Sequence, residues 1–170
     1  AEVVLITGPV SLPDPPGICV ERVETTEQMA EAVRAALPVA DLLIMAAAPA
    51  DFRPVRTEAT KRPRGDGSLT LEFEATEDIL TSTRDARKKD AVIVGFALET
   101  GNAYPRAQEK LKKKALDLIV VNDALEPGAG FDVDTNRVTL ISPTESRALP
   151  LMSKEQVADA ILDQIEPRLV

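Results

Sequence analysis

Apolar residues recur along the chain in two patterns, short continuous runs and stripes at a spacing of three to four residues. Short runs typical of buried parallel strands occupy residues 41–46, 91–96 and 116–121. Residues 2–6 predict a further strand, and residues 18–23 predict a shorter one that is partly exposed. Stripes at helical spacing lie over residues 25–38, 76–86, 102–115 and 153–165. This alternation predicts an α/β fold in which a mostly parallel sheet is flanked by helices.

Capping residues mark the expected starts of three helices. Thr25 with Gln28 and Ser153 with Gln156 each have the spacing of a capping box, in which a hydroxyl and an amide bond reciprocally to the first turn. Thr76 precedes the apolar residues of the second helix and is expected to cap it.

Two further segments, 69–73 and 137–141, predict antiparallel arms or edge strands rather than members of the parallel sheet. A Gly-Asp-Gly turn at 65–67 precedes the first of them. Short apolar strands of this kind also suit pairing with a second copy across a two-fold axis. We find no repeat, low-complexity tract or long linker, so we expect a single domain over residues 1–170.

Composition narrows the classes of function. A net charge of −8 and an aromatic content of 3% argue against a protein that binds nucleic acid through its phosphates or by base stacking. With no His and with Cys19 as its one cysteine, the chain offers neither a disulfide, a histidine-based triad nor a zinc site. Any metal would be a hard cation held by oxygens, Mg²⁺ first among them. We find no signal peptide and no apolar run of about 18 residues, and therefore expect a cytoplasmic protein.

The strongest candidate site follows the strand over 41–46, in the sequence DLLIMAAAPADFRP. Ligands of open α/β sheets bind outside the carboxyl ends of the strands, where small residues let a ligand approach the backbone. Asp51 would project there, able to hold a ribose hydroxyl or a cation. A run of cations follows in the next loop, as in an anion site: Arg53, Arg56, Lys61, Arg62 and Arg64. Tight packing of the strand end and a solvated loop explain the same residues, so both interpretations stay open.

A set of segments, taken together and in this order, resembles one family. They are TGPVSLPDPPG (7–17), AAAPADFRP (46–54), TKR (60–62), VGFALET (94–100), DLIVVND (117–123) and GAGFDVDTN (128–136). The set is similar over nearly the whole chain to phosphopantothenoylcysteine synthetase, the ligase half of the bacterial two-part coenzyme A biosynthesis protein. The resemblance implies a Rossmann-like or ribokinase-like fold with β-arm strands that serve dimerisation.

The resemblance implies a CTP-dependent carbon–nitrogen ligase. Members of the family join 4′-phosphopantothenate to cysteine: CTP activates the carboxylate as an acyl-cytidylate with loss of pyrophosphate, and the amine of cysteine then displaces CMP. They use Mg²⁺ and act as homodimers whose active sites are built across the interface. A flavin-dependent decarboxylase precedes this domain in the bacterial fusion, so we expect it as a fusion partner, and neither FMN nor decarboxylation in this chain.

The resemblance also implies roles for individual residues, carried over position by position. Ala47 and Ala48 would border the cytosine, and Asp51 would hold the ribose or the cation. Lys61 would meet the triphosphate, on a loop that closes over it and excludes water from the acyl-nucleotide. Lys61 and Asp51 are thus the candidates for catalysis, and Asp51 is also the candidate metal ligand. The other residues expected along the crevice are Gly8 with the turn to Ser11, Phe52, Phe96 through its backbone, Asn122 and Asp123.

The chain departs from the family pattern at its beginning. Members start with an additional strand, a Gly-Gly-Thr type turn and a loop with an Asn and a Ser-Ser-Gly run, and the printed sequence begins after these. We expect nucleotide contacts of the 46–61 stretch to persist without that segment and full turnover to require it. Pro49 in the run of alanines and Thr60 before Lys61 are smaller departures that remove no expected contact.

Two other functions compete with the ligase. A dinucleotide-dependent oxidoreductase would need G-x-G-x-x-G after the first strand, and the residues from Gly8 to Ser11 do not supply it. A truncated or non-catalytic nucleotide-binding or dimerisation module of the same fold stays open. Turnover separates the ligase from such a module, nucleotide selectivity separates both from the oxidoreductase, and the preference for CTP over ATP rests on the resemblance.

Overall fold

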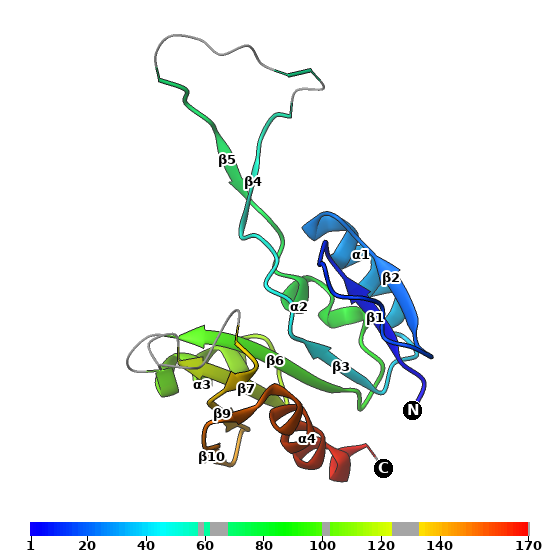
Figure 1. Ribbon diagram of the computed structural model, residues 1–170, viewed down its shortest axis with the longest axis vertical. Helices are drawn as coiled ribbons and strands as arrows, with labels where there is room; N and C mark the ends of the chain where they lie inside the picture. The colour runs from blue at the N-terminus through cyan, green and yellow to red at the C-terminus, as the bar shows by residue number, and fades with distance from the viewer. Residues whose placement is uncertain (58–59, 62–67, 100–102, 124–132, 170) are drawn as a thin grey trace.

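A five-stranded sheet forms the centre of the protein, which we describe from a computed structural model (Figure 1). The structure describes residues 1–57, 60–61, 68–99, 103–123 and 133–169. The strand order is β10–β9–β7–β6–β3. The parallel part of the sheet consists of β7 (Leu118–Asp123), β6 (Val92–Glu99) and, at the edge, β3 (Leu42–Met45). The sheet continues antiparallel through β9 (Val138–Ile141) and β10 (Ser146–Ala148).

Helices cover both faces of this sheet (Figure 1). One face packs with α1 (Thr26–Ala36), α2 (Ile79–Ser82) and α3 (Ala103–Lys113), and the other with α4 (Lys154–Ile165). Successive side chains of a strand point to opposite faces, so Ile93 of β6 belongs to the first core and its neighbour Val94 to the second. The predicted α/β fold, a largely parallel sheet flanked by helices, is therefore confirmed.

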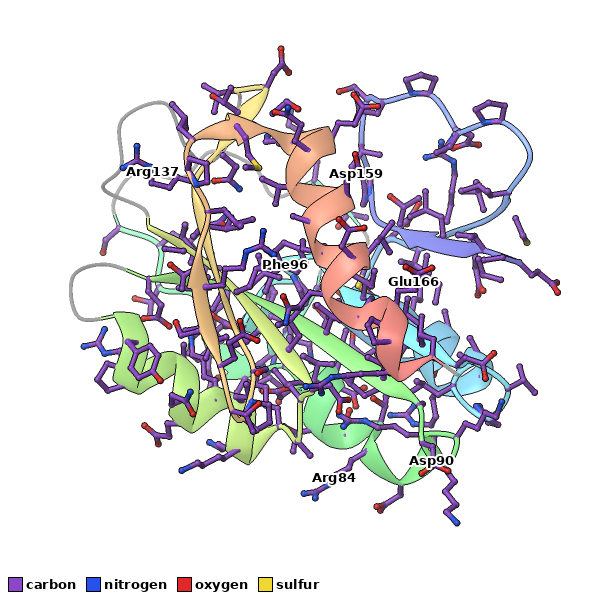
Figure 2. All side chains as sticks on the ribbon, turned by 90° about the horizontal axis from the view of Figure 1, so that it is seen from below. Arg84, Asp90, Phe96, Arg137, Asp159 and Glu166 are labelled. Carbon is purple, nitrogen blue, oxygen red and sulfur yellow. The ribbon has the colours of Figure 1, made fainter. Side chains whose placement is uncertain are left out.

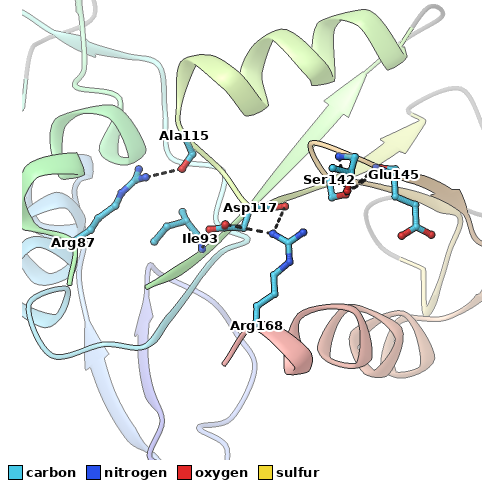
Figure 3. Close-up of polar contacts among 8 residues, drawn as sticks. Arg87, Ile93, Ala115, Asp117, Ser142, Glu145 and Arg168 are labelled. Carbon is cyan, nitrogen blue, oxygen red and sulfur yellow. Dashed lines mark hydrogen bonds and ion pairs between the residues drawn. The ribbon is translucent and has the colours of Figure 1, made fainter. Parts of the chain in front are cut away.

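Asp117 holds the beginnings of β6 and β7 together (Figure 3). Its backbone N–H donates to the Ile93 carbonyl at 2.9 Å, and its Oδ2 accepts from the Ile93 N–H at 2.8 Å. Arg168, in the short helix η2 (Glu166–Arg168), lies with its Nη1 3.4 Å from Asp117 Oδ1. One carboxylate thus ties two central strands to the C-terminal end.

The first two strands pair with each other rather than with the central sheet. β1 (Val4–Thr7) and β2 (Cys19–Arg22) form a separate parallel pair. Ile6 and Val23 pack into the core that contains α1, which places this pair beside that helix. A second small pair joins β8 (Thr135–Asn136) to β11 (Met152–Ser153) ahead of α4.

A β-hairpin arm projects from the body (Figure 1). It is formed by β4 (Phe52–Pro54) and β5 (Phe73–Ala75), which pair antiparallel. The strand predicted over 69–73 therefore lies later than expected, and the turn predicted at 65–67 falls outside the described residues. The prediction that 137–141 forms an arm or edge is wrong: β9 is antiparallel as expected, but it is buried between β7 and β10.

The capping predictions have mixed outcomes. Both capping boxes are present, Thr25 with Gln28 at the start of α1 and Ser153 with Gln156 at the start of α4. Thr76 does not cap α2, because Asp78 is the N-cap and its side chain accepts from the Thr81 N–H.

The apolar residues predicted for one helix over 76–86 divide between α2 and η1 (Arg84–Ala86), a single 3₁₀ turn. No helix in the described part of the chain is both long and apolar enough to span a membrane.

We predict that Asp78 stabilises α2 both as its N-cap and as the partner of Lys114, whose Nζ lies 2.8 Å from Asp78 Oδ2. Asp78→Ala should lower the free energy of unfolding by about 1 kcal/mol, the usual cost of losing an N-cap. Asp78→Asn is the matched control, since it keeps a capping oxygen and removes the charge. Denaturant unfolding of both variants at neutral pH measures the two contributions separately.

The charge contribution should depend on pH. Burial alone would raise the pKa of the Asp78 carboxyl, but the hydrogen bond and charge of Lys114, with the Thr81 N–H, hold that pKa below its ordinary value. The carboxylate therefore stabilises the fold above its unfolded pKa of about 3.9 and loses this effect as the pH falls through the folded pKa. The stability difference between wild type and Asp78→Asn should shrink below about pH 4; an undiminished difference under strong acid would contradict the assignment.

Candidate functional site

A cleft of about 460 Å³ opens at the end of β3, and we call it the first cleft. Its wall begins with residues 46–50, the alanine loop, which carries the chain from β3 toward the arm. Residues 76–80 around the start of α2 form the facing wall. Residues from β6, β7, β8 and α4, together with the residue that follows α3, also line it: Phe96, Asn122, Asn136, Lys154 and Lys114. Its volume falls within the range of roughly 300–1,000 Å³ that is usual for small-molecule sites.

Strand register explains why residues distant in sequence meet in the first cleft. Met45 at the end of β3 lies opposite Gly95 of β6, and Leu98 lies opposite Asn122 of β7. Phe96 and Asn122 occupy even positions, like Val94 and Val120, so they point toward the face that α4 covers (Figure 2 labels Phe96). The parallel strands thus deliver these side chains to one edge of the sheet.

Five of the residues expected from the sequence line the first cleft: Ala47, Ala48, Asp51, Phe96 and Asn122. Asp51 is exposed, and its backbone carbonyl accepts from the Thr76 N–H at 2.9 Å. Thr76 Oγ1 donates in turn to the Ala50 carbonyl at 2.6 Å. These two bonds fix the alanine loop against the chain that enters α2.

Gly8 and Phe52, two other expected residues, lie in a neighbouring second cleft of about 950 Å³. Pro9 and Val10 line it as well, with β1 and the start of α1, while Ser11 does not line it. The second cleft shares residues 47–50 and Thr76 with the first. The single crevice expected from the sequence is therefore two adjoining clefts, with the alanine loop as their common wall.

Paired charges surround the first cleft. Asp78 faces Lys114 across 2.8 Å, and Glu77 accepts from Arg34 Nη2 of α1 at 3.1 Å. Lys154, at the start of α4, brings a second ammonium group to the wall. The cleft therefore combines carboxylates and cations, an arrangement that suits a polyanion bound with a metal ion.

Asn122, which lines the first cleft, carries a buried acceptor. Its Oδ1 is buried and has no hydrogen-bond partner among the described residues. A buried carbonyl oxygen without a partner costs free energy, so a ligand that donates a hydrogen bond there would recover that cost. Asp123 ends β7 beside it, but its side chain lies outside the described part.

The carboxylate at the first cleft suits a metal ion that binds together with a phosphate-bearing ligand. Among the described residues no three of His, Cys, Asp and Glu cluster closely enough to bind a metal by themselves. Asp51 offers one carboxylate at the cleft. Mg²⁺ is commonly held by one or two carboxylates together with substrate phosphates and water, and Asp51 suits that arrangement.

The described cations expected to form an anion site do not gather at one cleft. Lys61 is exposed between the two strands of the arm and lines neither cleft. Arg53 lines the second cleft, but its charge is offset by ion pairs with Glu27 and with Glu74, the latter at 2.7 Å. Arg56 is exposed on the same arm, and Arg62 and Arg64 fall outside the described residues.

Several residues that line the first cleft could not be predicted from the sequence. Lys114 closes a run of lysines whose position at the end of a helix is explained by the helix dipole alone. Asn136 and Lys154 come from β8 and α4, far along the chain from the alanine loop. No spacing in the sequence connects these residues, because the sheet brings them together.

Comparison with curated proteins finds relatives that match nearly the whole of this chain. The coenzyme A biosynthesis bifunctional protein CoaBC of Bacillus subtilis (strain 168) is 43% identical over 167 residues, which are 97% of this chain and 41% of that protein. A cysteine/cysteine sulfinic acid decarboxylase of an unknown prokaryotic organism is 41% identical over 97% of this chain and 46% of its own length. The chain therefore spans less than half the length of these curated relatives.

A solved structure supports the fold. The crystal structure of the C-terminal domain of a coenzyme A biosynthesis bifunctional protein CoaBC superposes with a TM-score of 0.80 at 34% identity. The match covers 99% of this chain and 74% of that one.

Family membership follows from the whole chain rather than from one motif. The model of the DNA/pantothenate metabolism flavoprotein C-terminal domain matches residues 1–169. That range includes both clefts, the arm and all the segments on which the resemblance rests. The chain belongs to the family of DNA/pantothenate metabolism flavoprotein C-terminal domains.

Proposed function

We propose that this chain is the ligase domain of a coenzyme A biosynthesis enzyme, which joins 4′-phosphopantothenate to cysteine at the expense of CTP. The observation that carries the proposal is the first cleft, where the alanine loop, Asp51, Phe96, Asn122 and Lys114 meet. The identity to the Bacillus subtilis coenzyme A biosynthesis protein supports the choice of pathway.

The first cleft offers a different surface to each part of a nucleotide. The alanine loop and Phe96 present a small-residue edge and an apolar ring suited to the base. Asn122 Oδ1 would accept from an exocyclic amino group such as that of cytosine. Lys114 and Lys154 bring ammonium groups that pair with phosphate oxygens. Mg²⁺, when bound, would offset further charge on those oxygens, with Asp51 as its protein ligand.

The second cleft suits the acyl substrate. Activation requires the carboxylate oxygen to attack the α-phosphorus while pyrophosphate leaves, so the two substrates must approach within bonding reach. The alanine loop is the common wall of both clefts, and its small side chains allow close approach from either side. In the second half-reaction the cysteine amine attacks the acyl carbonyl, the C–O bond to the phosphate of CMP breaks, CMP leaves with the electron pair, and the amine proton passes to solvent. Positioning and charge carry both steps, since the chain has no His to act as a base.

The arm supports the proposal of a homodimer. Its apolar side chains are exposed, Phe52 by 62%, Leu71 by 58% and Phe73 by 52%. An apolar hairpin of this kind is stabilised when it packs on a partner. Lys61 lies on this arm and lines neither cleft of its own chain. We therefore assign Lys61 to the site of the partner subunit, where it would meet the triphosphate.

We expect CTP with Mg²⁺ to bind the 170-residue chain and to raise its unfolding temperature more than ATP, UTP or NAD at equal concentration. Binding to the folded state alone adds about 2.7 kcal/mol of stability at a hundredfold excess over the dissociation constant. Lys114→Gln should weaken CTP binding about tenfold, as expected for a lost charge-assisted hydrogen bond.

An assay of ligation decides whether the chain is a ligase or a non-catalytic nucleotide-binding module. Ligation is measured as CMP and pyrophosphate release that depends on both 4′-phosphopantothenate and cysteine. It is assayed with the chain and with a form extended at its N-terminus by the matching segment of the Bacillus subtilis relative. Turnover by either form supports the ligase. CTP binding without turnover in both forms would favour the nucleotide-binding module, and no selectivity for CTP would contradict the nucleotide assignment.

We predict that Lys61 acts across the dimer. Lys61→Ala and Lys114→Gln should each abolish most of the ligase activity of the form that turns over, assayed at a CTP concentration well below the dissociation constant of the wild type. Mixing the two after reversible dissociation should restore about a quarter of wild-type activity, because half the dimers are mixed and each has one intact site. If Lys61 serves its own subunit, no mixed dimer has an intact site and mixing will restore nothing. Each variant alone, taken through the same dissociation, is the control.

A further inference from the structure

Arg87 connects two walls of the first cleft through hydrogen bonds made outside the cleft. It follows η1 and precedes β6, and it is half-buried. Its Nη2 donates to the Leu80 carbonyl at 2.5 Å and to the Lys114 carbonyl at 3.1 Å. Its Nη1 donates to the Ala115 carbonyl at 2.8 Å (Figure 3). One guanidinium thus bonds α2 to the residues that follow α3.

The chain that Arg87 holds on the α3 side needs such support. The Leu116 N–H bonds to the Leu111 carbonyl and the Ala115 N–H to the Lys112 carbonyl, the pattern of a Schellman motif. Ala115 adopts φ of 49°, a left-handed conformation that favours glycine and strains a residue with a Cβ. The hydrogen bonds from Arg87 satisfy the carbonyls of Lys114 and Ala115 at this strained turn.

Both walls carry groups that face the cleft. Leu80 lines it directly, and Lys114 places its Nζ 2.8 Å from Asp78 Oδ2 across the start of α2. The backbone of Lys114 is held on one side by the helix and on the other by Arg87. The position of its ammonium group therefore depends on a contact that lies outside the cleft.

We propose that Arg87 is a positioning residue, which sets Lys114 against the bound nucleotide and keeps α2 at the correct distance from it. The inference rests on the proposed nucleotide site and adds to it a residue that does not line the cleft. A guanidinium suits this task because its rigid planar fork donates several hydrogen bonds in fixed directions and stays charged at all physiological pH values. A lysine at the same position would supply one flexible donor group.

The test is a double-mutant cycle on the binding of CTP with Mg²⁺, measured by calorimetry on the folded chain. Arg87→Gln should weaken binding about tenfold, the size expected when hydrogen bonds to a charged group are lost. In the Lys114→Gln background the same change should have little further effect, because the two residues act through one contact. Binding of cytidine, which lacks phosphates, should change little in any variant.

Lys89→Gln is the matched control, since Lys89 lies two positions later, is exposed and lines neither cleft. It should leave CTP affinity unchanged. If Arg87→Gln does not fold, Arg87→Lys replaces it, with an intermediate loss expected. A purely structural role would lower the unfolding temperature and leave the affinity of the folded protein unchanged, or would give losses that add to those of Lys114→Gln; either result overturns the inference. Absence of CTP binding by the wild type would instead refute the nucleotide site itself.

Discussion

The parallel register of β3, β6 and β7 is the constraint on which the rest of the structure depends. Hydrogen bonds between buried strands fix Met45 opposite Gly95 and Leu98 opposite Asn122. A shift by one residue would turn every side chain to the opposite face, removing Phe96 and Asn122 from the cleft and placing Ile93 and Val94 in the wrong cores. The site therefore inherits its geometry from the core, and Asp117 secures that register at the amino ends of β6 and β7.

Local sequence patterns correctly predict the strands and helix caps that interactions between nearby residues stabilise. The runs at 91–96 and 116–121 form strands because their apolar residues are buried on both faces. The run at 41–46 forms a strand beside β6, although Ile44 is exposed at this edge of the sheet. Both capping boxes form because their partners are three residues apart. The cap of α2 was misassigned to Thr76 because Thr76 and Asp78 are both good caps. Thr76 instead bonds to Ala50, a contact twenty-six residues away that no local rule contains.

In the candidate site, too, some residues could be predicted from the sequence and others could not. Asp51, Phe96 and Asn122 could be placed at one edge of the sheet, because they lie toward or beyond the carboxyl ends of parallel strands, and these ends lie together. Lys114 could not, since its position depends on how α3 ends and on what Arg87 holds, and Arg87 precedes it by a long stretch of chain. Lys61 is a residue that the resemblance assigns to a site its own chain does not bring it to. The resemblance places it at the triphosphate, whereas in the structure it lies on the arm, outside both clefts.

The ion pair between Asp78 and Lys114 links stability to binding. In the free protein it orders the start of α2 and keeps an ammonium group at the cleft without leaving it unpaired. Phosphate oxygens that bind Lys114 must compete with Asp78, so part of the attraction between ligand and lysine is offset by the interaction that the lysine gives up. Because Asp78 also accepts from the Thr81 N–H, it keeps one partner after Lys114 turns to the ligand. The cleft can thus exchange one charge partner for another while α2 stays capped, which reduces the reorganisation that binding requires.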